Sequence, residues 1–182
     1  MKKKKEFTII LPKFFGEKPI DKTIADKADK VINRKFTKYS KDIFENPQKY
    51  YYKFSFKINK VNEDDTATTQ LVGHEISTDV LSKSVRKFTT RIDTRVKGIT
   101  EDNVEIIIKA IIITAKNVKI NIAKKIRAET IKFLKLYITK NQLDKIMKDL
   151  ISDDLQRDIK KSLNSIYPIG IVEIRKTEIN YK

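Results

Sequence analysis

The chain has no cysteine, no tryptophan and a single histidine, His74, among its 182 residues. Without cysteine it can form neither disulfides nor thiolate metal sites, and it has no cysteine nucleophile. Only four glycines are present, and no P-loop or other glycine-rich phosphate motif occurs among them. These shortages argue against an enzyme, so we expect no catalytic residue, no cofactor and no bound metal.

Two groups of residues are the only candidates for chemistry. His74 and Glu75 with Asp79 could ligate a metal, but a site needs three or four convergent ligands, and their spacing matches no known motif. The end of a strand followed by the start of a helix explains them better. The acidic run at residues 63–65 lies in a predicted turn, where such residues are common. An enzyme built on His74 is therefore the weakest of three functional hypotheses.

Long hydrophobic runs are also missing. The longest apolar stretch, Ile106 to Ile113, is interrupted by Lys109 and is too short to span a bilayer. The N-terminal lysines are followed by strand-like sequence, not by the apolar segment of about 7–15 residues that marks a signal peptide. We therefore expect a cytoplasmic protein with no membrane partner.

Positive charge is what the chain has in excess. Lys and Arg number 40 against 24 Asp and Glu, which gives a formal net charge of +16 and a pI near 9.8. A charge of this size attracts polyanions over the Debye length. Nucleic acid is the first partner to consider and an anionic membrane surface the second. Because most of the basic residues are lysines, contacts to phosphate are favoured over bidentate reading of bases.

Hydrophobic periodicity predicts mostly strands, then helices, then one closing strand. Strands are expected at residues 7–11, 31–39, 50–59, 66–72, 90–97, 104–114 and 169–179. Helices are expected at 77–88, from 116 onward, after Asn141 and after Ser152, and residues 12–30 are expected to be a surface loop. The predicted fold is α+β, with an antiparallel, barrel-like β-sheet core, C-terminal helices packed beside it and a closing C-terminal strand. Length predicts one domain over residues 1–182, with a basic arm at 1–5.

Tyrosines and phenylalanines alternate with polar residues along the strand predicted at 50–59. The alternation favours core packing of this aromatic face over a platform for stacking bases. Tyr51 lies on the opposite face, and a stacking role for it stays open.

Basic residues form several groups that together favour phosphate binding. The candidate RNA-binding residues are Lys2, Lys3, Lys4, Lys5, Arg86, Lys87, Arg91, Arg95, Lys116, Lys119, Lys124, Lys125, Arg127, Lys132, Lys135, Arg175 and Lys176. Two simpler interpretations stay open. The lysines of the long helix could be a solvated face, and Arg91 or Arg95 could pair with Asp93.

Several segments resemble the archaeal and eukaryotic small-subunit ribosomal protein family eS1, also written S3ae. The stretch LISDDLQRDIKKSLNSIYPIGIVEIRK (150–176) is similar to that family's helix followed by its IYP and VEIRK signature. VGHEIS (72–77), VRKFTTRID (85–93) and EFTIILPKFFGEKPI (6–20) resemble its GHEL-type strand end, its basic element and its opening. The resemblance covers nearly the whole chain in a consistent order.

The resemblance implies a structural, non-catalytic protein on the platform of the small subunit. Its partners would be small-subunit rRNA near its 3′ end, neighbouring ribosomal proteins of the platform, and mRNA near its exit. A β-rich, barrel-like core with helices is also implied. The chain departs from the family at 114–122, where TAKNVKINI replaces an Arg-rich tract and leaves only Lys116 and Lys119 basic. The alternative function is a free RNA-binding or mRNA-handling protein outside the ribosome.

Overall fold

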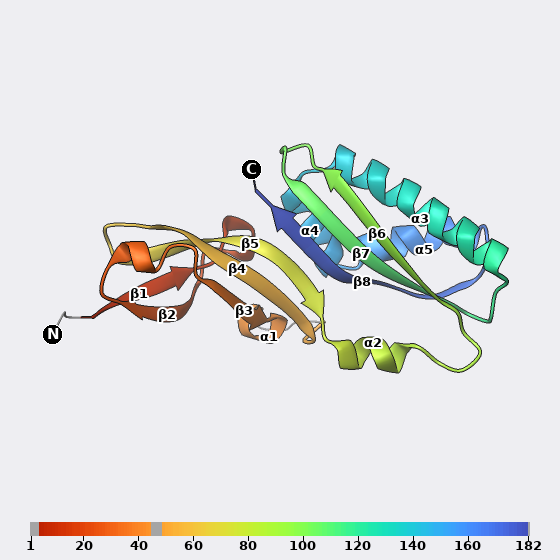
Figure 1. Ribbon diagram of the computed structural model, residues 1–182, viewed down its shortest axis with the longest axis horizontal. Helices are drawn as coiled ribbons and strands as arrows, with labels where there is room; N and C mark the ends of the chain where they lie inside the picture. Colours follow the sequence, from red (N-terminus) through yellow and green to blue (C-terminus); the bar gives the residue numbers. More distant parts are fainter. Residues whose placement is uncertain (1–3, 45–48, 182) are drawn as a thin grey trace. The chain divides into compact units, whose positions relative to one another are not determined.

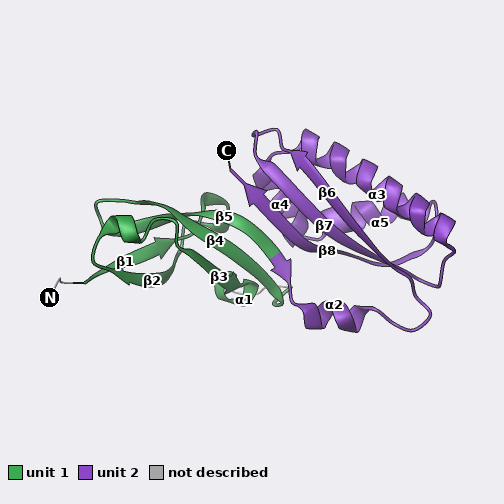
Figure 2. Ribbon diagram, viewed as in Figure 1, with its two compact units in different colours: residues 1–74 green, residues 75–182 purple. Residues whose placement is uncertain are grey.

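The structure, a computed structural model, describes residues 4–44 and 49–181. Contacts within the chain divide it into two compact units, Met1–His74 and Glu75–Lys182, which Figure 2 shows in green and purple. That both units fold together as one domain stays a prediction made from chain length.

Unit 1 is built on a mixed sheet. Its strands are β1 (Lys5–Ile10), β2 (Pro19–Ala25), β3 (Lys35–Tyr39), β4 (Tyr52–Val61) and β5 (Thr66–Ile76), joined by the short helices η1 (Lys13–Phe15), η2 (Ala28–Lys30) and α1 (Ser40–Ile43). The strand order is β2-β1-β5-β4-β3. The pairs β1–β2 and β3–β4 are antiparallel, while β1 and β5 run parallel. Among the described residues β2 and β3 are edges, so the sheet is open and the barrel-like closure is not confirmed.

The core of unit 1 follows the predicted alternation of β4. Tyr52, Phe54, Phe56 and Ile58 are buried, whereas the residues between them are only partly buried. The ring of Phe15 closes this face, with its centroid 5.3 Å from those of both Phe54 and Phe56. Such edge-to-face pairs stabilise the core beyond the area that they bury. The core assignment of this aromatic face is therefore confirmed from Tyr52 onward, whereas Tyr50, which precedes the strand, is 65% exposed.

Unit 2 packs helices against an antiparallel three-stranded sheet. Its elements are α2 (Thr78–Ser84), β6 (Arg91–Ile99), β7 (Glu105–Thr114), α3 (Ile120–Lys140), α4 (Leu143–Ile151), α5 (Asp154–Asn164) and β8 (Ile169–Asn180). β7 lies between β6 and β8 and is antiparallel to both. Figure 1 shows the three long helices together on one side of these strands. The α+β class and the closing C-terminal strand are confirmed.

Helix α3 packs along β6 through one stripe of buried side chains. Ile126, Thr130, Leu134 and Ile138 are 0% exposed, and they recur every four residues along the helix. A Cβ atom at Gly98 would lie 2.9 Å from Cγ2 of Ile138, closer than real Cβ contacts. Gly98 therefore lets the C-terminal part of α3 approach β6.

Two expectations for unit 1 are wrong. Residues 12–30 are not only a loop, because β2 pairs with β1 from Pro19 to Ala25. β2 is an edge strand with charged and polar side chains, and such strands lack a clear apolar alternation. Gly73 does not end the strand that begins at Thr66, since β5 continues to Ile76.

Three helix boundaries in unit 2 also differ from the prediction. α2 ends at Ser84, because Val85 is extended and Phe88 has a positive φ of 65°. The N-cap of α4 is Gln142, while the side chain of Asn141 donates to the carbonyl of Tyr137. The N-cap of α5 is Asp153, which is left-handed at φ 67°.

Candidate nucleic-acid interface

Three loops meet at the end of unit 2 where β6 begins and β7 ends. The backbone N–H of Thr90 donates to Oγ1 of Thr114 at 3.0 Å, and the N–H of Thr114 donates to the carbonyl of Thr90 at 3.0 Å. The N–H of Val118 donates to Oγ1 of Thr90 at 3.1 Å, and that of Ala115 donates to the carbonyl of Pro168 at 3.1 Å. These bonds bring the loops before β6, after β7 and before β8 together.

The segments that meet there contain no carboxylate side chain. Neither Asp nor Glu occurs in residues 80–92, 106–128 or 159–172. Six exposed basic residues lie in these loops and in the first turns of α3, and among the described residues none has a carboxylate within 4.0 Å. We call them the basic end: Arg86, Lys87, Lys116, Lys119, Lys124 and Lys125. All six were predicted from the sequence to bind RNA, and the structure places them at one end of the unit.

The N-terminus of α3 adds to the positive field at the basic end. No side chain caps this helix, whose N-cap residue is Lys119, and its first turn has no acidic residue. The unpaired N–H groups of a helix N-terminus carry about half a positive charge. Together with the lysines around it, this helix end favours an approaching phosphate group.

Phe88, the last residue of the helix expected at 77–88, is instead an exposed residue outside α2, within the basic end. Its side chain is 69% exposed, and Nζ of Lys87 lies 5.2 Å from its ring centroid. The hydroxyl of Thr89 donates to the carbonyl of Arg86 at 2.7 Å and closes this turn. A left-handed backbone at a bulky residue costs about 1 kcal/mol or more. Apolar spacing alone could not reveal this turn.

The open face of the β6–β7–β8 sheet mixes both charges. Arg91 donates to Asp93 through Nε at 3.1 Å and through Nη2 at 3.0 Å, which is the pairing left open by the sequence. Lys176 lies 3.5 Å from Glu75 and 3.8 Å from Glu178. Among the described residues, Arg95 on the same face has no ion pair within 4.0 Å.

Lysines on this face are neutralised within the unit. Lys109 donates to Glu178 at 2.6 Å, and this hydrogen bond is the main reason why the pKa of Glu178 lies below its ordinary value. Lys97 lies 2.6 Å from Glu105. The open face therefore offers less free positive charge than the basic end.

The outer side of α3 is basic beyond its first turns. Lys132 and Lys135 are exposed like Lys124 and Lys125, as the helical pattern predicted. Arg127 instead donates through Nε to the carbonyl of Asp93 at 3.2 Å and ties α3 to β6. Arg175 is exposed at an irregularity in the β7–β8 register.

The N-terminal arm is described in part. Lys2 and Lys3 lie outside the described residues. Lys4 is exposed, and Nζ of the exposed Lys5 lies 3.9 Å from Asp65.

The other residues considered from the sequence, the metal candidate His74 and the stacking candidate Tyr51, pack against neighbouring side chains. His74 is 1% exposed, and its ring centroid lies 5.0 Å from that of Tyr52. In the part of the chain that the structure describes, no group of three or more His, Asp or Glu residues could hold a metal ion. Tyr51 is half-buried, with ring contacts to Tyr50 and Tyr52. Within the same part of the chain, no helix has the length and apolar character to cross a bilayer.

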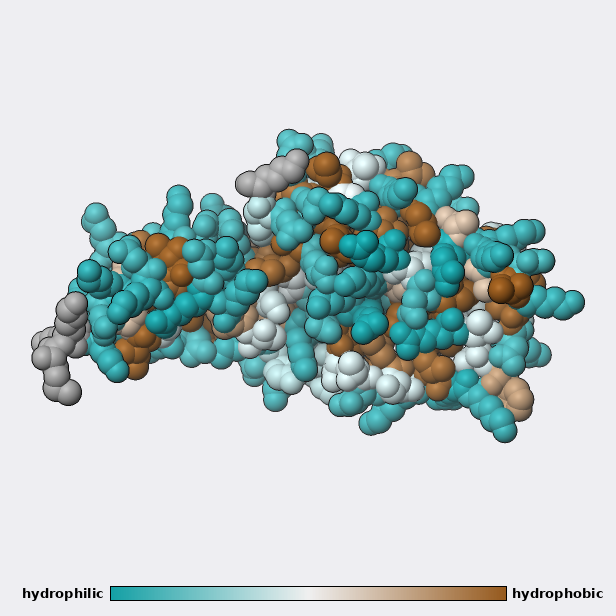
Figure 3. All heavy atoms as spheres, viewed as in Figure 1, coloured by the Kyte–Doolittle hydropathy of each residue, from teal (hydrophilic) through white to brown (hydrophobic). Residues whose placement is uncertain are grey.

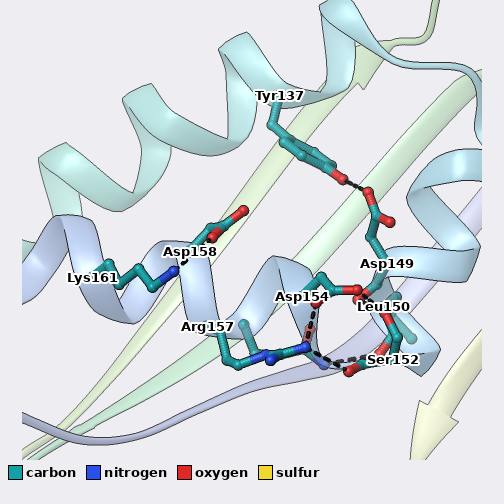
Figure 4. Close-up of polar contacts among 9 residues, drawn as sticks. Tyr137, Asp149, Leu150, Ser152, Asp154, Arg157, Asp158 and Lys161 are labelled. Carbon is teal, nitrogen blue, oxygen red and sulfur yellow. Dashed lines mark hydrogen bonds and ion pairs between the residues drawn. The ribbon is translucent and has the colours of Figure 1, made fainter.

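The opposite end of unit 2, where β6 turns into β7 and α3 leads into α4, is rich in carboxylates, several of which have partners within the unit. We call it the acidic end: Glu101, Asp102, Glu105, Asp144, Asp149, Asp153 and Asp154. Asp102 accepts from the N–H of Leu143 at 2.9 Å and so caps α4. Figure 4 shows Tyr137 donating to Asp149, and Asp154 between Ser152 and Arg157.

Two tyrosines at the acidic end are held neutral. Burial first, and then the hydrogen bond to Asp149, raise the pKa of Tyr137 well above 10.0. Partial burial and the charge of Asp144 raise the pKa of Tyr181 to about 12. An additional anion would be unfavourable here, which is the opposite of the situation at the basic end.

Comparison with known proteins identifies the family of the chain. The model of the Ribosomal S3Ae family matches residues 1–182. The chain belongs to the ribosomal S3Ae family. Small ribosomal subunit protein eS1 of Methanothrix thermoacetophila is 32% identical over 178 residues, which cover 98% of this chain and 84% of that protein.

Other S3Ae relatives show similar coverage. Those of Methanoculleus marisnigri and Sulfurisphaera tokodaii, both named small ribosomal subunit protein eS1, are each 29% identical over 178 residues. These matches cover 98% of this chain and 90% and 92% of the two relatives. The family resemblance stated from the sequence is confirmed.

Proposed function

We propose that this S3Ae protein is a structural component of the small ribosomal subunit and binds rRNA phosphates through the basic end of unit 2. The observation that carries the proposal is the convergence of three segments without a single carboxylate. An RNA backbone placed there meets Lys, Arg and a helix N-terminus with no repelling anion from these segments. The relatives named as small-subunit proteins support the ribosomal role.

The proposal extends to the location of the protein. The family resemblance supports a position on the platform, near the mRNA exit and beside neighbouring ribosomal proteins, in the cytoplasm. Nothing in the residues of the site calls for catalysis, so the protein would act by binding and by shaping RNA.

The candidate RNA-binding residues fall into two groups, those without an ion pair in the protein and those that already form one. The residues of the basic end have no carboxylate to give up, and Lys4, Arg95, Lys132, Lys135 and Arg175 are likewise without an ion pair among the described residues. Lys5, Arg91 and Lys176 would have to exchange an ion pair for a phosphate. Such exchanges gain less affinity, so we expect the first group to dominate.

The salt dependence of RNA binding tests this surface. Arg86→Ala with Lys87→Ala should lower the slope of log affinity against log salt by about two, since each lost phosphate contact removes about one. Lys140→Ala with Lys145→Ala, two exposed lysines near the acidic end, is the matched control and should leave the slope unchanged. Equal slopes for both double variants would mean that the RNA interface lies elsewhere on the protein.

Sedimentation of native extract separates the two roles that the sequence left open. A ribosomal component should remain with small subunits in high salt. A free RNA-handling protein should dissociate and stay near the top of the gradient.

A further inference from the structure

Unit 1 carries a second basic surface that the proposed function does not use. It lies on the outward side of β3 and β4 and at Lys41 in α1. Neither Asp nor Glu occurs in residues 30–41 or 46–62, and Asp42, which follows Lys41, accepts from the backbone N–H of Tyr39 at 3.3 Å. None of its residues was singled out from the sequence. We call it the lysine–tyrosine face: Lys35, Thr37, Tyr39, Lys41, Lys53, Ser55 and Lys57.

The register of the two strands fixes this face. Lys35 lies opposite Lys57, Thr37 opposite Ser55, and Tyr39 opposite Lys53. In β4 the residues between these positions, Phe54 and Phe56, are 0% exposed and form the core. Because successive side chains of a strand point to opposite faces, the paired residues all point away from the core.

Among the described residues, no lysine of this face forms an ion pair. Like charges directly opposite each other on paired strands destabilise a sheet, and Lys35 and Lys57 are such a pair. Among the described residues neither has a carboxylate within 4.0 Å. On the other face of β3, Lys38 does pair with a carboxylate, Asp21, at 2.6 Å. An external polyanion would relieve the repulsion that the unit itself leaves in place.

Tyr39 adds an aromatic ring beside the lysines. The residue is 41% exposed, and Nζ of Lys53 and of Lys41 lie 5.2 and 5.6 Å from its ring centroid. Cation–π contacts at exposed sites are weak, so phosphate groups can draw both lysines away and leave the ring to a base. The hydroxyls of Thr37 and Ser55, 3.2 Å apart, are further donors for phosphate or sugar oxygens.

We infer that the lysine–tyrosine face binds a single-stranded segment of RNA, with phosphates at Lys35 and Lys57 and an unpaired base on Tyr39. Basic residues combined with an exposed aromatic on a sheet are typical of proteins that bind unpaired strands. A duplex would offer phosphates but no free base for the ring. The inference takes from the proposed function only that the polyanion is RNA, and its residues lie in unit 1.

Two double variants of equal charge test the phosphate contacts, with the full chain and a 12-nucleotide oligouridine as probe. Lys35→Ala with Lys57→Ala should lower the salt slope by about 1.4, because a single strand loses about 0.7 per contact. The control, Lys22→Ala with Lys30→Ala, removes two lysines of unit 1 that pair with Glu6 and Asp26, and it should leave the slope unchanged. Thermal melting should show that Lys35→Ala with Lys57→Ala folds at least as stably as the wild type.

Tyr39→Leu tests the base contact. Affinity for oligouridine should fall about 5- to 150-fold, the range for one lost stacked base, with the salt slope unchanged. Affinity for an RNA duplex of equal length should not change. Equal effects on both probes, or no effect on either, would overturn the assignment of a single strand.

The remaining outcomes separate this inference from the proposed function. If the Lys35 and Lys57 variant keeps the wild-type slope while the basic-end variants lose theirs, the inference is wrong and the proposed function stands. If the wild type binds no RNA, the proposed function itself fails. If the Lys35 and Lys57 variant binds RNA normally but no longer enters small subunits, the face contacts a protein and the inference is overturned.

Discussion

At one end of unit 2 six basic residues have no carboxylate within 4.0 Å among the described residues. At the other end Asp102, Glu105, Asp149 and Asp154 each accept a hydrogen bond or an ion pair from within the unit. Both ends are formed by the same strands and by α3. Figure 3 colours all residues by hydropathy, so lysines and carboxylates share the hydrophilic colour and the two ends are not told apart by it. What differs is whether the charges have internal partners. Free charge marks a surface that is open to a ligand, and paired charge marks one that serves folding.

The largest effect should come from the core beneath the basic end. Ile126→Ala removes a side chain that is 0% exposed and should lower the free energy of unfolding by about 2–5 kcal/mol. Lys125→Ala, one residue earlier on the exposed side, should change it by less than about 0.5 kcal/mol. Denaturant unfolding measures both values. Similar losses would show that the helix face is assigned wrongly.

Charge reversal sharpens the contrast between the ends. Lys116→Glu with Lys119→Glu should weaken binding of small-subunit rRNA by about 10- to 100-fold, since two phosphate contacts become repulsive. Lys140→Glu with Lys145→Glu makes the same change of net charge near the acidic end and should weaken it far less. Filter binding at fixed salt gives both affinities. Equal losses would mean that net charge, and not the basic end, governs binding.

Tyr137→Phe tests whether the acidic end serves folding. Loss of the hydrogen bond to Asp149 should cost about 1 kcal/mol at neutral pH and leave RNA binding unchanged. Because the pKa of Tyr137 is raised in the folded state, its contribution is fully present below pH 10.0 and is lost as the pH rises through the raised value. The stability difference between wild type and variant should therefore shrink only above pH 10.0. A difference that instead fades in acid would assign the effect to another group.

The smallest effect should distinguish two arginines of β6. Arg95, which has no ion pair among the described residues, should contribute about one to the salt slope of RNA binding, and Arg95→Ala should remove it. Arg91→Ala should change the slope less, because Arg91 is held by Asp93. Its effect on stability should stay within about 1 kcal/mol, as for exposed pairs in general. Salt titrations of the two single variants decide the point.

Elements with a clear apolar pattern could be predicted from the sequence. The alternation around Phe54 and the helical stripe of Ile126 and Leu134 each report one buried face, so strand β4 and helix α3 were found. β2 was missed because an edge strand needs no apolar face to pair its backbone. The turn at Phe88 was missed because its spacing from the preceding apolar residues is that of a buried helical position. The sequence pattern is the same whether the aromatic is buried in a helix or exposed in a left-handed turn.

The candidate site was only partly visible in the sequence. Basic residues could be picked out one group at a time, and those of the basic end were all found. Their sorting into free and paired charges depends on contacts across strands, such as the one between Lys109 and Glu178. The lysine–tyrosine face was overlooked because its lysines are scattered along two strands and gather only through the register of β3 with β4.

Hydrogen bonds to the hydroxyls of Thr90 and Thr114 link Thr90, Thr114 and Val118. They affect how the basic end would bind RNA. They join two loops before any ligand arrives, so the conformational entropy of ordering these loops is lost during folding rather than during binding. Association at the basic end should therefore behave as the docking of a rigid surface. The protein could then act as a fixed template to which the more pliable RNA adjusts its own shape.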